Sequence, residues 1–138
     1  MPPDDPREAL LAAARALVGE FTLIKQSITA GAVGAALESE SGRIYTGINL
    51  DLACGIGFCA EHSAVAEMLK HRETVVRRIV AVNDERVLAP CGRCREMLVQ
   101  VDSRNLDCEV LLPDGATMPL RELLPNAWLE QLLVAHRA

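Results

Sequence analysis

The stretch FCAEHSAVAEML, residues 58–69, decides how the fold of this chain is interpreted. Its apolar residues recur at helical spacing, which predicts a helix with one buried face formed by Val65, Met68 and Leu69. The later stretch APCGRCREMLVQ, residues 89–100, predicts a second helix from about Gly92 to Val101. Both helices have cysteine at or near their first turn, so this pair of helix ends is the first candidate for a functional site.

Strands are predicted on both sides of the first helix. Residues 32–50, AVGAALESESGRIYTGINL, indicate two strands joined by a turn at Gly42, because glycine suits a tight turn and the residues around Tyr45 suit a pleated surface. Two short apolar runs, RRIVAVND at 77–84 and DCEVLL at 107–112, predict buried strands. The alternation of helices and strands predicts an α/β fold, a three-layer sandwich with a mixed sheet.

Helices are also expected near both ends of the chain. Residues 7–21, REALLAAARALVGEF, repeat apolar residues at helical spacing, and Pro6 suits the first turn of a helix. We expect helical structure to run on through TLIKQSI, residues 22–28. Towards the other end, a turn is predicted at 113–115 and a last helix after Pro125.

Composition narrows the possible partners. A length of 138 residues predicts a single domain, residues 1–138, and a net charge of −5 without a basic block argues against nucleic acid as a partner. No stretch approaches the ~20 apolar residues of a membrane span, and the acidic start MPPDDPREAL lacks the features of a secretory signal. We therefore expect a soluble cytoplasmic protein with a small-molecule partner.

Three of the five cysteines predict a metal site. Cys91 and Cys94 are three residues apart, so on the first turn of a helix both sulfurs face the same way, where free backbone N–H groups favour thiolate. A helix and a strand separate Cys59 from Cys91, enough for a crossover that places the two helix starts side by side. Three such ligands suit Zn²⁺ with its fourth position left for water, which then loses a proton near neutral pH and becomes a nucleophile.

Glu61 gives this site a second chemical group. It lies too close to Cys59 to be needed as a ligand, and it can move protons between the water and a leaving group. Two alternatives remain: Cys91 and Cys94 can form a redox pair, or Cys54 can complete a closed structural zinc site. Cys108, in an apolar strand, is expected to be a core residue.

The motifs CAE at 59–61 and PCGRC at 90–94 resemble those of the cytidine deaminase family. The segments VGAAL, YTGINLD and LRELLPNAW also resemble family segments, in the same order, so the resemblance covers most of the chain. It implies the cytidine deaminase fold, zinc at the three cysteines, and Glu61 as the group that protonates N3 of the base and then the departing ammonia. It further implies a homotetramer with shared active sites.

The resemblance also implies a set of substrate contacts. Asn49 matches an asparagine that holds ribose hydroxyls, Asp51 stands where the family usually has glutamate, and Trp128 matches an aromatic residue that closes over the base. Ala60 is the fourth implied substrate-binding residue. The implied reaction is zinc-dependent hydrolytic deamination of cytidine or deoxycytidine to the uridine product.

Some positions depart from the family pattern. Gly31 replaces a family phenylalanine, which predicts a thinner pocket wall, and His62 replaces an arginine. We expect His62 to donate a hydrogen bond to a cysteine sulfur, since zinc with three thiolates carries net negative charge, and we assign Arg95 a supporting role around the site. The interval from Asn49 to Cys59 is also short, as in blasticidin S deaminase, so an enzyme of that type acting on a modified cytosine nucleoside is the alternative.

Overall fold

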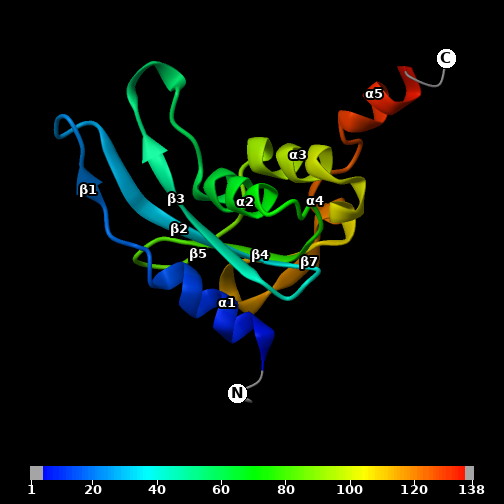
Figure 1. Cartoon of the computed structure of the whole chain (residues 1–138), viewed down its shortest axis with the longest axis horizontal. Helices are drawn as coiled ribbons and strands as arrows, with labels where there is room; N and C mark the ends of the chain where they lie inside the picture. The colour runs from blue at the N-terminus through cyan, green and yellow to red at the C-terminus, as the bar shows by residue number, and fades with distance from the viewer. Residues whose placement is uncertain (1–4, 136–138) are drawn as a thin grey trace.

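A mixed β-sheet runs through the computed structural model, which describes residues 5–135 (Figure 1). Its central strands follow the order β3-β2-β4-β6-β7, with β4 parallel to β6 and the other neighbours antiparallel. These strands are β2 (Thr29–Ser39), β3 (Ile44–Asp51), β4 (Val76–Val82), β6 (Glu109–Leu111) and β7 (Thr117–Pro119). Two short strands extend it: β1 (Phe21–Thr22) pairs with β2, and β5 (Val87–Leu88) pairs with β4.

Helices cover both faces of this sheet. Helix α1 (Pro6–Arg15) packs on one face, and α2 (Ala60–Lys70) and α3 (Gly92–Val101) lie on the other (Figure 1). Three short 3₁₀ turns join elements: η1 (Ala53–Gly55), η2 (Ser103–Asp107) and η3 (Pro113–Gly115). After β7 the chain forms α4 (Leu120–Leu123) and then α5 (Leu129–Ala135), which projects away from the sheet (Figure 1). The predicted three-layer α/β arrangement is confirmed.

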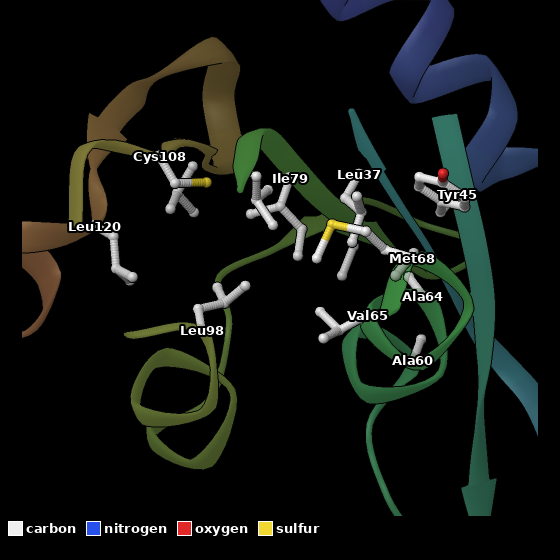
Figure 2. Packing of buried hydrophobic residues seen from close by; sticks show 14 residues of the cluster. Leu37, Tyr45, Ala60, Ala64, Val65, Met68, Ile79, Leu98, Cys108 and Leu120 are labelled. Carbon is white, nitrogen blue, oxygen red and sulfur yellow. The ribbon is translucent and has the colours of Figure 1, made fainter. Parts of the chain in front are cut away.

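Alternating strand residues divide the core between the two faces. On β2 and β4, Leu37 and Ile79 face α2 and α3, whereas the adjacent Ala36 and Val80 face α1, as the two-residue period of a strand requires. Figure 2 shows the larger cluster, where Met68 reaches from α2 towards the sheet. Full burial of each large side chain contributes roughly 1.5–3 kcal/mol to stability. Cys108 is 1% exposed within this cluster, so its assignment as a core residue is confirmed.

The first helix is shorter than its apolar pattern predicts. It begins at Pro6, after the capping residue Asp5, whose side chain accepts the Arg7 N–H at 2.9 Å, and it ends at Arg15. The expected continuation through residues 16–28 is wrong, because Phe21 pairs with Ala30 in the sheet. Gly19 disfavours helix, and pairing with a strand that follows in sequence decides the conformation instead.

The remaining predicted elements lie close to their expected positions. The hairpin of β2 and β3, the strand β4 and the helix α3 agree with the sequence analysis. The predicted turn at 113–115 is a single 3₁₀ turn with Asp114 at φ 65°. Among residues 5–135, no helix combines the length and the apolar character needed to cross a bilayer.

Candidate active site

Cys59 is placed by the end of β3 and by the start of α2. It is the residue before the first helical turn, and its side chain makes no capping hydrogen bond, so the sulfur remains available. The preceding Phe58 exchanges two backbone hydrogen bonds with Leu50, both 3.0 Å long, which fixes the chain on β3 just before the cysteine. Gly47 lets α2 lie directly on β3, since a Cβ atom there would be 2.4 Å from the Ala64 nitrogen.

Cys91 occupies the equivalent position on the second helix. It directly precedes α3, again without a capping hydrogen bond from its side chain, and Cys94 follows in the first turn. The sulfurs of Cys59 and Cys91 lie 3.5 Å apart, and those of Cys91 and Cys94 lie 3.4 Å apart. All three lie within 4.8 Å of one another. The predicted convergence of two helix starts is confirmed.

This cluster has the dimensions of a zinc site. With a Zn–S bond of about 2.3 Å, tetrahedral geometry separates neighbouring sulfurs by about 3.8 Å, which small side-chain shifts from the observed spacing provide. Within residues 5–135, the cluster contains three candidate ligands and Cys54 is not among them. Cys54 is exposed on the η1 turn at φ 61°. The residues present therefore fit an open zinc site with three protein ligands rather than a closed one with four.

The surrounding protein shifts the pKa values of the three thiols in different directions. Burial raises the pKa of the Cys94 thiol and, together with the neighbouring Cys91, that of Cys59. Burial acts in the same direction on Cys91, but hydrogen bonds from the Cys94 backbone and sulfur outweigh it and lower its pKa. The thiols of Cys59 and Cys94 thus stay protonated until a metal cation displaces their protons, because a metal binds the thiolate form.

Glu61 lies in the first turn of α2, beside the cluster. Only 4% of its surface is exposed, and burial raises the pKa of its carboxyl group. A buried carboxylate that lacks a cationic partner is a common arrangement for a proton-transfer group. Glu61 is therefore a buried carboxyl group at the same cavity as the cysteines.

A cavity of about 450 Å³ opens in front of the cysteines. Asn49, Asp51 and Ala60 line it, together with Glu61 and two of the three cysteines. Asn49 Oδ1 accepts the Val33 N–H at 2.9 Å, at a bulge in β2, which leaves the amide NH₂ of Asn49 for a ligand. Four predicted site residues outside the metal cluster, including Glu61, thus share one cavity.

Gly31 lies in β2, close to the segment that joins α1 to β2. It is not among the residues lining the cavity, and its φ of +86° suits glycine. A Cβ atom there would lie 2.7 Å from the Gly19 oxygen and 3.3 Å from the Phe21 ring. Backbone and an aromatic ring from the α1–β2 connection therefore lie next to Gly31, and the thinner pocket wall expected there stays a prediction.

Three predicted site residues lie around the cavity rather than in it. His62 Nδ1 lies 3.6 Å from the Cys94 sulfur, so the tautomer with hydrogen on Nδ1 can donate to it. Arg95 donates to the carbonyls of Pro90 and Leu123. Trp128 is 52% exposed next to α5 and does not line the cavity of its own chain.

The cavity also contains a residue whose position was not anticipated. Arg93 lines it and lies 3.4 Å from the Gly57 carbonyl, while its side chain is exposed like an ordinary helix charge. Its place between Cys91 and Cys94 is the signal that could have identified it, because that turn faces the cavity. A larger cavity of about 750 Å³ lies between α1 and η3, lined by charges of both signs and by no cysteine.

Comparison with known families agrees with this geometry. Residues 7–109 match the model of the cytidine and deoxycytidylate deaminase zinc-binding region. The chain belongs to this deaminase family. Like the family region, it therefore has a zinc-binding site, and the Cys59, Cys91 and Cys94 cluster is the set of residues that can hold the ion.

Individual deaminases are similar to this chain over most of its length. A probable cytidine deaminase of Dictyostelium discoideum is 31% identical over 75% of this chain and 72% of its own length. The cytidine deaminase of Mycobacterium tuberculosis is 34% identical over 70% and 72%. That of Shewanella pealeana is 36% identical over 70% of this chain, but the match spans only 31% of the longer relative.

Solved deaminase structures share the fold. The crystal structure of cytidine deaminase from Mycobacterium tuberculosis superposes with a TM-score of 0.72 and 26% identity, covering 91% of this chain and 98% of that one. The Burkholderia pseudomallei enzyme gives a TM-score of 0.71 at 28% identity, covering 88% and 98%. The cytidine deaminase-like fold expected from the motifs is confirmed.

Proposed function

We propose that this deaminase-family chain hydrolyses cytidine and deoxycytidine to uridine and deoxyuridine with release of ammonia. One observation carries the proposal: three cysteine sulfurs converge beside a buried glutamate at a cavity of about 450 Å³. A cavity of this size lies within the usual range for small-molecule sites. The family membership agrees with hydrolysis of a C–N bond in a cyclic amidine.

Cys59, Cys91 and Cys94 hold the zinc ion as thiolates in this proposal. A zinc ion held by these residues would supply a polarised water molecule with a pKa near neutrality. Glu61 would accept one proton from that water and deliver it to N3 of the base. It would then take the remaining proton of the added hydroxyl and pass it to the amino group, which leaves as ammonia while the hydroxyl becomes the carbonyl. The raised pKa of Glu61 suits this work, because a group that both accepts and returns a proton acts best with a pKa near the working pH.

Asn49 and Asp51 orient the sugar in the proposed complex. The free NH₂ of Asn49 donates to one hydroxyl oxygen, and Asp51 accepts a hydrogen bond from another hydroxyl. The first turn of α2 at Ala60 lies against the base. A site built for sugar hydroxyls leaves polar groups unpaired when the sugar is absent, so free cytosine is a poor substrate.

We further propose a cytoplasmic homotetramer in pyrimidine salvage, folded as a single domain over residues 1–138. Trp128 supports shared sites, since it is half exposed and lies outside its own chain's cavity. Ile56, in the loop beside the cavity, is 69% exposed and offers an apolar surface to a neighbouring subunit. Trp128 then closes over the base in an adjacent chain.

Ammonia release tests the proposed reaction. Purified zinc-loaded protein is assayed with cytidine, deoxycytidine, free cytosine, 5-methylcytidine and blasticidin S. We expect cytidine and deoxycytidine to react, free cytosine to react poorly, and Cys91→Ala to lose both zinc and activity, whereas the matched control Cys54→Ser keeps both. Zinc binding without ammonia release from any cytosine nucleoside would refute the enzymatic proposal, and preference for blasticidin S would favour the alternative activity.

A further inference from the structure

Arg95 connects the cysteine loop to the C-terminal part of the chain. Its Nε donates to the Pro90 carbonyl at 2.8 Å, and its Nη1 donates to the Leu123 carbonyl at 3.0 Å. Pro90 immediately precedes Cys91, and Leu123 is the last residue of α4. One half-buried guanidinium group therefore spans two segments that lie more than thirty residues apart in sequence.

The position of Arg95 on α3 explains this reach. It stands four residues after Cys91, so both lie on one helix face, with Cβ atoms about 5–6 Å apart. Helical side chains tilt towards the N-terminus, which directs Arg95 back over the turn that holds the cysteines. The planar guanidinium then offers two N–H groups in a fixed geometry, which a lysine cannot reproduce.

The backbone of Cys91 is held on its helix side, where its carbonyl accepts the Arg95 backbone N–H at 3.1 Å. Pro90 has no N–H to donate, and Gly92 on the other side is conformationally permissive. The last sheet pairing before the cysteine is between Leu88 and Ala81. The hydrogen bond from Arg95 to the Pro90 carbonyl thus fixes the peptide group that leads into the ligand.

The neighbouring Glu96 holds the other end of the same C-terminal connection. Its Oε1 accepts the Trp128 N–H at 3.0 Å, at the start of α5. A carboxylate beside the free N–H groups of a helix start is favourable. Consecutive residues of α3 therefore anchor both Leu123 and Trp128, the two ends of the segment that joins α4 to α5.

We propose that Arg95 is a positioning residue that holds Cys91 in place for zinc and couples the metal site to the C-terminal segment carrying Trp128. The inference rests on zinc ligation by Cys91 but is independent of the reaction catalysed. Removal of the guanidinium leaves the Pro90 and Leu123 carbonyls without this donor, so the ligand loop and the α4–α5 connection loosen together. Supporting residues around metal sites typically change metal affinity by about 10–100-fold when they are lost.

Two signals test this coupling without substrate. Zinc release from the holoprotein to a chromogenic chelator reports on the metal site, and fluorescence of Trp128, the single tryptophan, reports on the C-terminal segment. We expect Arg95→Met to accelerate zinc release at least ~10-fold and to shift the Trp128 emission. The matched control Arg121→Met, which removes an exposed arginine of α4, should change neither. Glu96→Gln should shift the emission and change zinc release by less than the arginine variant does.

A more conservative variant keeps the test decisive if Arg95→Met does not fold. Arg95→Lys retains the charge and one donor. It should therefore release zinc faster than the wild type but more slowly than the methionine variant, for which a ~10-fold acceleration is expected. Wild-type release in either variant would overturn the positioning role. An unchanged Trp128 emission in Arg95→Met or Arg95→Lys would overturn the coupling. Absence of deaminase activity in every protein would instead count against the proposed function and leave this result intact.

Discussion

Two glutamates at opposite ends of α2 have opposite environments. Glu61, in the first turn, is 4% exposed, and burial raises the pKa of its carboxyl group. Glu73, just past the last turn, accepts hydrogen bonds from the hydroxyls of Tyr45 and Ser39, the latter at 2.9 Å. The Tyr45 hydroxyl, with Ser41 next in importance, lowers the pKa of Glu73 to about 2.

The difference separates a carboxylate suited to chemistry from one that stabilises the fold. Hydrogen-bond donors around Glu73 satisfy the ionised form and hold it there, so that group ties the β2–β3 turn to the end of α2. Glu61 is buried at a cavity without such a set of donors, so its ionised form is less favoured and a proton is more easily retained. Environment, rather than residue type, distinguishes these two carboxyl groups.

The largest expected effect is on turnover at Glu61. Glu61→Gln preserves the shape of the side chain but removes the proton-transfer group, so turnover of cytidine should fall by ~100-fold or more. Zinc content and the urea unfolding midpoint should be retained. Glu73→Gln is the matched substitution at the other end of the helix and should keep wild-type turnover. Near-normal turnover in Glu61→Gln would remove the distinction between the two carboxylates.

The same substitution at Glu73 should affect stability. Glu73→Gln replaces an ionised acceptor of two hydroxyl hydrogen bonds with a neutral amide, and hydrogen bonds to charged groups are the stronger kind. Its urea midpoint should be lower than that of the wild type at pH 7. Because Glu73 is partly exposed, the shift should be modest. A midpoint equal to that of wild type would show that the cluster around Tyr45 does not depend on charge.

The smallest expected effect is a difference in acid sensitivity. The pKa of Glu73 is about 2 in the folded state and about 4.3 in an unfolded chain, so its contribution is fully present above pH ~4.3 and is lost as pH falls towards 2. Between pH 5 and 3 the wild-type midpoint should therefore fall more than that of Glu73→Gln. Loss of zinc in acid affects both proteins alike. Parallel curves would contradict the lowered pKa.

Local sequence patterns predicted the central part of the fold. The helix at Gly92–Val101 and the hairpin of β2 and β3 follow from apolar periodicity and turn residues. The conformation of residues 16–28 could not be predicted from these patterns, since Phe21 becomes part of a strand by pairing with Ala30. Such pairing depends on tertiary structure, which local periodicity does not encode.

The metal cluster could also be predicted from the sequence, whereas the contacts around it could not. Cys59, Cys91 and Cys94 were identifiable because ligand spacing and helix starts carry geometric information. The close approach of the Gly19 carbonyl and the Phe21 ring to Gly31 was not identifiable, because it depends on tertiary structure. Similarly, nothing local indicates that Arg95 reaches Leu123.

Gly47 has a consequence for engineering this protein. A Cβ atom at that position would lie 2.4 Å from the Ala64 nitrogen and 2.7 Å from the Ala60 oxygen, both in the helix that begins after Cys59. Any larger residue would displace α2 and move a metal ligand with it. Libraries intended to change substrate range should therefore keep Gly47 fixed and diversify the cavity rim at Leu52 rather than at Gly55, whose φ of +67° disfavours any larger residue.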